Sequence, residues 1–152
     1  MKKRNIIIIS IVFILLITIF TVKIFKQKEN KPISSTDLKT QYNYIKTSSK
    51  PSLIIFSYDA DCCESTKKFF DEYNSSAKQL MKDYEGKFIS LFINIGTLND
   101  NEEEILLNIE KENDVSQIPS LLIRDSSGKP IEVIEGPFDS DEVRKILNEV
   151  IK

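Results

Sequence analysis

The chain has 152 residues, of which 41% are hydrophobic and 29% are charged, and its formal net charge is -2. This length and apolar content suit one globular domain with appendages and exclude a disordered chain. The near-neutral charge gives no reason to expect a nucleic-acid partner, because phosphate binding needs a clustered positive surface. The absence of histidine excludes His-dependent nucleophilic triads and His-ligated zinc.

The N-terminal residues predict a membrane segment. Residues 1–4 carry basic side chains, and an almost unbroken apolar run follows over residues 6–22. This run is close to the lower limit of roughly 17 residues for a helix that spans a bilayer. Because no small-residue cleavage site follows it, an uncleaved anchor is favoured over a cleaved signal peptide.

Three parts of the chain follow from this pattern. Residues 1–25 are expected to form an N-terminal transmembrane anchor, residues 26–34 a polar tether and residues 35–152 the folded domain. A very short basic tail is hard to translocate, which favours an inside N-terminus. The expected localisation is therefore a single-pass membrane protein whose domain is extracytoplasmic.

The periodicity of the remaining residues predicts alternating helices and strands. The aromatic residues of the long central helix are expected to lie in the core. The order begins with strand–helix–strand alternation, which predicts parallel pairing, and a short turn at Gly128 predicts an antiparallel hairpin near the end. A mixed central sheet flanked by helices follows. The predicted elements are a helix after the cap candidates at 34–37, a strand at 53–56, a helix of about five turns at 65–84 with Phe69, Phe70, Tyr73 and Tyr84, a strand at 88–95, a helix at 99–109, strands at 121–123 and 131–134, and a helix at 139–152.

Two segments resemble the thioredoxin family. Ala60-x-x-Cys63, which follows the first predicted strand, resembles the segment that leads into the family's redox motif. Residues 115–120, Val-Ser-Gln-Ile-Pro-Ser, resemble the stretch that contains its cis-proline. The resemblance covers roughly residues 36–152 and implies a thioredoxin-like α/β fold and thiol–disulfide exchange. It also implies that Pro119 is cis and that the backbone of Ile118 pairs with a substrate peptide.

The cysteine pattern departs from that family. Family enzymes carry two cysteines separated by two residues, whereas Cys62 and Cys63 are adjacent. In one register Cys63 takes the nucleophilic position and Thr66 the place of the resolving cysteine. In the other register Cys62 comes first and Ser65 takes the second place. The buried aspartate that family enzymes use as a proton acceptor is missing, and Ser57 lies nearest its place.

Cys63 is the expected nucleophile, with Cys62 as its candidate resolver. A helix N-terminus favours the thiolate, which is the form that attacks disulfides. Nearby lysines strengthen this effect, and nearby carboxylates oppose it. The residues expected to modulate the thiol are Glu64, Ser65, Thr66 and Lys67.

Three functions are compatible with these residues. The first is thiol–disulfide exchange with extracytoplasmic proteins or small thiols, supported by a membrane electron donor. The second is a catalytically degenerate interaction module that keeps the fold. The third is capture of a soft metal or metalloid by the cysteine pair, a weak signal because two thiols stand without histidine. No resident metal or cofactor is expected.

Overall fold

The computed structural model describes residues 37–152, and the predicted anchor and tether lie outside the described residues. Within residues 37–152 no helix is both long enough and apolar enough to cross a bilayer. The elements in chain order are α2 (Leu38–Thr47), β1 (Ser52–Ser57), α3 (Glu64–Asp83), β2 (Ile89–Asn94), the short 3₁₀ helix η1 (Ile95–Thr97), α4 (Asp100–Glu112), β3 (Ser120–Arg124), β4 (Pro130–Glu135) and α5 (Ser140–Val150).

The sheet is mixed, as the element order predicts. Its strand order is β2-β1-β3-β4, with β1 parallel to β2 and antiparallel to β3, and with β3 antiparallel to β4. The two central strands, β1 and β3, are buried along their whole length. The apolar run over residues 53–56 predicts a strand that is covered on both faces, and β1 confirms this prediction. The apolar run over residues 88–95 predicts a second central strand, but this prediction is wrong: β2 lies at the edge of the sheet and is only partly buried, and β3 takes the second central place.

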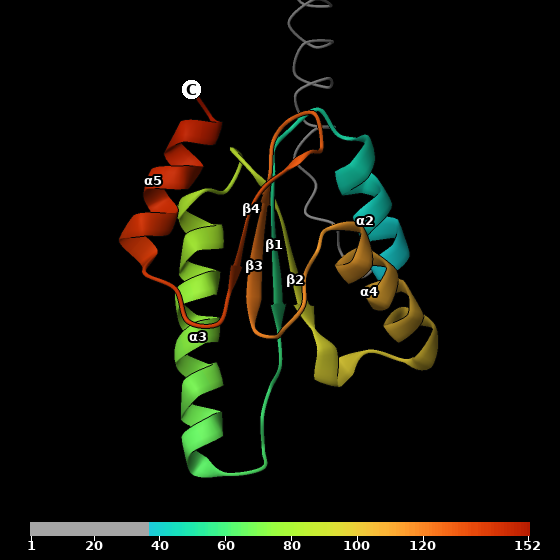
Figure 1. The fold of residues 1–152 in the computed structure, drawn as a ribbon, viewed down its shortest axis with the longest axis vertical. Coiled ribbons are helices and arrows are strands. Elements are labelled where there is room, and N and C mark those ends of the chain that lie inside the picture. The colour runs from blue at the N-terminus through green and yellow to red at the C-terminus, as the bar shows by residue number, and fades with distance from the viewer. Residues whose placement is uncertain (1–36) are drawn as a thin grey trace, which may run out of the picture. The chain divides into compact units, whose positions relative to one another are not determined.

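Helices cover both faces of the sheet (Figure 1). Alternate residues of β1 point to opposite faces, so Leu53 packs with α3 and α5 whereas Ile54 packs with α2 and α4. Most of the remaining core comes from the apolar faces of these helices, for example Leu80 in α3 and Ile109 in α4, both almost fully buried. The domain therefore has two cores, one on each side of the sheet.

The prediction that all four aromatic residues of the long helix belong to the core is wrong at its N-terminal end. Tyr73 and Tyr84 are buried, but Phe69 is 37% exposed and Phe70 is half-buried. Figure 1 shows the reason: the first turns of α3 extend past the end of the strands, so these turns have no sheet to pack against. Phe70 instead packs edge-to-face with Phe69 and with Tyr58.

Polar side chains cap α2 and α4, and the cap of α2 comes from the candidates at residues 34–37. Asp37 caps α2 by accepting a hydrogen bond from the N–H of Thr40 at 3.0 Å. Asn99 and Glu102 form a reciprocal capping box at the start of α4, with the Asn99 N–H donating to Glu102 at 3.2 Å. The first glutamate of the acidic run 102–104 therefore has a capping role.

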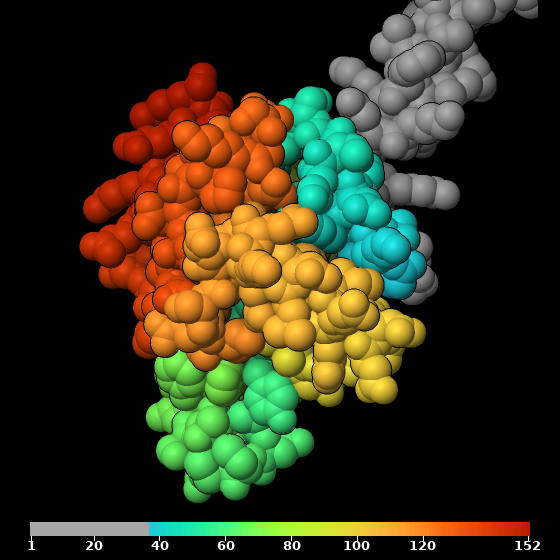
Figure 2. Space-filling model, turned by 45° about the vertical axis from the view of Figure 1, so that its right-hand side comes forward, coloured from blue at the N-terminus to red at the C-terminus, as the bar shows by residue number. Residues whose placement is uncertain are grey.

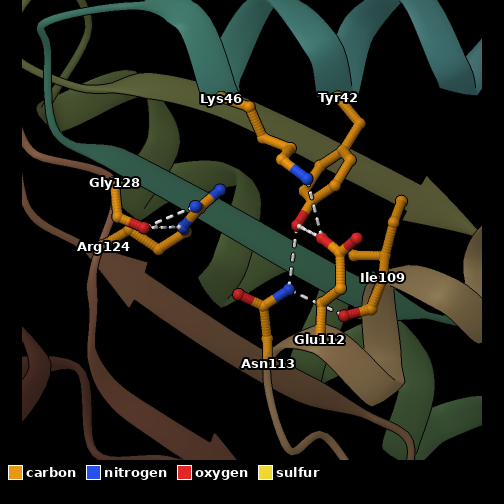
Figure 3. A network of polar contacts seen from close by, with 7 residues as sticks. All are labelled: Tyr42, Lys46, Ile109, Glu112, Asn113, Arg124 and Gly128. Atoms are coloured by element: carbon orange, nitrogen blue, oxygen red, sulfur yellow. Dashed lines mark hydrogen bonds and ion pairs between the residues drawn. The ribbon is translucent and has the colours of Figure 1, made fainter.

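A polar network joins α2 to the end of α4 on the face opposite α3 (Figure 3). The hydroxyl of Tyr42 donates to Glu112 at 3.1 Å and accepts from the side-chain amide of Asn113 at 3.0 Å. Lys46 forms an ion pair with the same Glu112 carboxylate at 3.0 Å. The guanidinium of the buried Arg124 lies 5.8 Å from the centre of the Tyr42 ring. This network connects α2 to the end of α4 and does not include the cysteines.

Candidate active site

Cys63 is the N-cap residue of α3. Its backbone is extended, and its carbonyl accepts the first helical hydrogen bond from the N–H of Lys67 at 2.9 Å. Cys62 and Cys63 are both exposed and form no disulfide. The start of α3 projects from the bottom of the molecule as the green segment in Figure 2, so the thiols are accessible to solvent.

The thiol of Cys63 is surrounded by hydrogen-bond donors. Its sulfur lies 3.0 Å from the Thr66 hydroxyl, 3.5 Å from the Ser65 hydroxyl and 3.9 Å from the sulfur of Cys62. The pKa of Cys63 is lowered to about 6. The largest cause is the Ser65 hydroxyl, followed by the Thr66 hydroxyl and N–H and then the Cys62 thiol. At neutral pH the thiolate therefore predominates.

The groups that lower this pKa most are hydroxyls rather than the charged neighbours that the sequence emphasised. Lys67, expected to favour the thiolate, and Glu64, expected to oppose it, are not among the largest contributions. Short hydroxyl side chains in the first turn of a helix can reach back to the side chain of the N-cap residue. The sequence spacing places the hydroxyls of Ser65 and Thr66 near the Cys63 thiol. Only the side-chain geometry shows that they lower its pKa.

The predicted substrate-binding segment lies at the same end of the sheet. The Ile118–Pro119 peptide bond is cis, as the resemblance implies. Ser120, the next residue, pairs with Phe56 near the end of β1, and the cysteine loop leaves from that end. The side chain of Ile118 is 36% exposed. The hydrogen bonds of the Cys63 thiol stay within residues 62–66 and do not reach Ile118.

A second polar network, not predicted from the sequence, anchors the start of the cysteine loop. The fully buried hydroxyl of Ser57 donates to the side-chain carbonyl of Asn74 in α3. The amide of Asn74 donates to Asp59 at 3.2 Å, and the amide of Asn94 donates to the other Asp59 oxygen at 2.5 Å. Ser57 lies nearest the place where the resemblance expects a proton-accepting aspartate, and here its hydroxyl donates to the side-chain amide oxygen of Asn74. The detectable signal was a polar residue, Asn74, in the apolar stripe of a helix.

The two thiols have no further strong metal ligands grouped with them in the described part of the chain. Residues 37–152 contain no group of three or more His, Cys, Asp or Glu side chains arranged to hold a metal ion. Two thiols alone make an incomplete set for a structural site.

Comparison with known proteins identifies the fold. No family model and no curated protein matches the chain. Among solved structures, the chain is similar to thioredoxin O2 from Arabidopsis thaliana in the oxidized state, with 16% identity over 75% of this chain and 86% of that chain and a TM-score of 0.52. A designed protein matches with 16% identity over 80% of this chain and 96% of its own, at a TM-score of 0.51.

An uncharacterized thioredoxin-like protein from Clostridium perfringens is also similar, with 20% identity over 68% of this chain and 73% of that chain and a TM-score of 0.49. The similarity to thioredoxin O2, together with the sheet order and the cis-proline, establishes a thioredoxin-like α/β fold for the described domain. The expectation from the resemblance is confirmed at the level of the fold.

Proposed function

We propose that this protein exchanges thiols and disulfides through Cys63, with extracytoplasmic proteins or small thiols as substrates. The observation that carries the proposal is an exposed thiol at a helix N-terminus whose pKa is about 6. A low-pKa, accessible thiol is the usual property of a reactive cysteine, whereas structural cysteines are buried and inert. The thioredoxin-like fold supports the same chemistry.

The reaction proceeds in two balanced steps. The Cys63 thiolate attacks one sulfur of a substrate disulfide, forming a mixed disulfide and releasing the other substrate sulfur as a thiolate. Cys62, whose sulfur lies 3.9 Å away, then gives up its proton, which the released substrate thiolate takes up, and its sulfur attacks the Cys63 sulfur and releases the second substrate thiolate. The substrate gains two electrons, and the cysteine pair loses two and becomes a vicinal disulfide. A small thiol or a dithiol partner in the membrane restores the pair by the reverse exchange.

The proposal includes the membrane context that the sequence predicts. The apolar run over residues 6–22 would tether the domain, and the basic N-terminus would leave the domain on the outer side. Disulfides persist in oxidising compartments outside the cytosol. A domain tethered on the outer side of the membrane would therefore be in the compartment where disulfide-bonded substrates occur.

The test compares two serine variants of the whole chain, purified in mild detergent because of the apolar N-terminal run. The wild type is expected to react with the small aromatic disulfide 5,5′-dithiobis(2-nitrobenzoate) and to reduce a disulfide-linked peptide. Cys63→Ser should abolish both reactions. Cys62→Ser should keep the first attack but accumulate a mixed disulfide with the peptide, visible by intact mass. Full activity in Cys63→Ser would overturn the assignment.

One observation favours a second function, an interaction module without turnover. Exposed apolar side chains lie close to the thiol in sequence, because Tyr58 is 42% exposed and Phe69 is 37% exposed. Exposed aromatic residues are enriched at protein interfaces. A variant with both cysteines replaced by serine separates the two functions: retained capture of the same partner protein favours the interaction module, and loss of capture favours the thiol chemistry.

A further inference from the structure

The carboxylate of Glu135, at the end of β4, accepts four hydrogen bonds from the loop before the cis-proline. One oxygen accepts from the Ser116 N–H at 2.6 Å, from the Ser116 hydroxyl at 2.8 Å and from the Gln117 N–H at 3.2 Å. The other oxygen accepts from the side-chain amide of Gln117 at 3.1 Å. The donors on Ser116, with those on Gln117, hold the pKa of Glu135 below its ordinary value. Glu135 is therefore an ionised acceptor at neutral pH.

Gly136, the residue that follows β4, holds the other side of the loop. The N–H of Gly136 donates to the carbonyl of Pro119 at 2.8 Å. Consecutive residues, Glu135 and Gly136, thus fasten residues 116–117 and Pro119, and Ile118 lies between the two attachment points. Within residues 37–152, no backbone hydrogen bond uses the N–H or carbonyl of Ile118.

Ile118 therefore presents an unpaired peptide edge beside a partly exposed apolar side chain. An unpaired backbone edge is suited to an extended polypeptide, which pairs through its own N–H and carbonyl groups. Such pairing is stronger when the edge is already held in place, because less conformational freedom is lost on binding. A small disulfide has no peptide backbone and gains nothing from this edge.

We propose that Glu135 is a positioning residue, which holds the Ser116–Ile118 backbone ready to pair with an extended segment of a disulfide-bonded polypeptide substrate. This inference rests on the proposed function and on the expectation from the resemblance that the backbone of Ile118 pairs with a substrate peptide, and it adds the role of Glu135 in holding that backbone. Glu135 acts through the loop, since both oxygens of its carboxylate accept hydrogen bonds from Ser116 or Gln117.

The test compares three variants of the whole chain on two substrates. Glu135→Ala removes the acceptor, and Glu135→Gln retains a carbonyl oxygen that can accept from Ser116 and Gln117. Glu132→Ala removes an exposed glutamate of the same strand and is the matched control for charge. The substrates are 5,5′-dithiobis(2-nitrobenzoate) and a disulfide-linked peptide whose reduction is followed by fluorescence.

In Glu135→Ala, the KM for the peptide is expected to rise about tenfold, the loss that about 1.4 kcal/mol of binding free energy produces. Its kcat and its rate with the small disulfide should stay within about twofold of the wild type, which also shows that the variant is folded. Glu135→Gln should recover most of the KM, and Glu132→Ala should match the wild type. Amide exchange at Ser116 and Gln117 should accelerate only in Glu135→Ala.

The outcomes separate this inference from the proposed function. If the wild type reacts with both substrates and Glu135→Ala keeps the wild-type KM for the peptide, the positioning role of Glu135 is overturned alone. If the KM rises equally in Glu132→Ala, loss of charge explains the effect and the positioning role is also overturned. If the wild type reacts with neither substrate, the proposed function fails and this inference fails with it.

Discussion

The thiol of Cys63 lies 3.0 Å from the hydroxyl of Thr66, one helical turn farther along α3. In the first register of the thioredoxin resemblance, Thr66 occupies the place of the resolving cysteine. A hydroxyl cannot form a disulfide, but it can donate a hydrogen bond to a thiolate. In the proposed reaction, the same position would therefore stabilise the Cys63 thiolate instead of resolving its mixed disulfide, and Cys62 would be the neighbouring thiol left for resolution.

Removing this hydroxyl should weaken the thiolate. In Thr66→Val the pKa of Cys63 is expected to rise from about 6 toward the ordinary value near 8.5, because one of its main hydroxyl donors is lost. The measurement is the pH dependence of alkylation by iodoacetamide, with peptide masses assigning the site. Thr47→Val is the matched control, since the Thr47 hydroxyl bonds only to the backbone of its own helix. An unchanged midpoint in Thr66→Val would contradict the role of this hydroxyl.

Restoring a thiol one turn along should speed resolution. Thr66→Cys is expected to raise peptide-disulfide turnover by at least about tenfold, because a thiol at position 66 can resolve the mixed disulfide without forming the vicinal Cys62–Cys63 disulfide. Ser65→Cys tests the alternative register, in which Cys62 is the nucleophile. A larger gain in Ser65→Cys than in Thr66→Cys would move the nucleophile from Cys63 to Cys62.

The low pKa of Cys63 also predicts a pH-dependent stability. The pKa is about 6 in the folded chain and about 8.5 when unfolded, so between these values the unfolded chain binds more protons. The thiolate contribution is therefore complete above the unfolded pKa and is lost as pH falls through about 6. The urea midpoint of the wild type should exceed that of Cys63→Ser by more at pH 9 than at pH 5. A difference in urea midpoint that is smaller at pH 9 than at pH 5 would contradict the assigned pKa.

The Ser57–Asn74 hydrogen bond is expected to contribute to the stability of the domain. Asn74→Ala leaves the fully buried Ser57 hydroxyl without an acceptor and should lower the free energy of unfolding by about 1–3 kcal/mol. The double variant Ser57→Ala/Asn74→Ala should recover part of this loss, because no unpaired hydroxyl remains buried. Urea unfolding measures both changes.

Asn108→Ala, on the exposed surface of α4, is the control for loss of an asparagine and should change stability by less than about 0.5 kcal/mol. A double variant less stable than Asn74→Ala would show that the Ser57 hydroxyl has another acceptor.

Much of the domain follows from the amino-acid sequence by itself. The apolar run of β1, the cap at Asn99 and the apolar face of α5 are encoded by neighbouring residues, so their periodicity predicts the elements and their order. The cis-proline and the place of Cys63 at a helix start follow from short local patterns that resemble a known family. These properties depend on residues a few positions apart, and the folded chain realises them almost unchanged.

Other properties were decided by the tertiary structure alone. The aromatic pattern of α3 predicts a buried stripe, but Phe69 is exposed because the helix outruns the sheet. The bond from Ser57 to Asn74 joins residues 17 positions apart, and the bonds from Ser116 to Glu135 join residues 19 apart. Such contacts depend on how helices and strands pack together. Periodicity records which face of an element is buried, but it does not record which distant side chain that face meets.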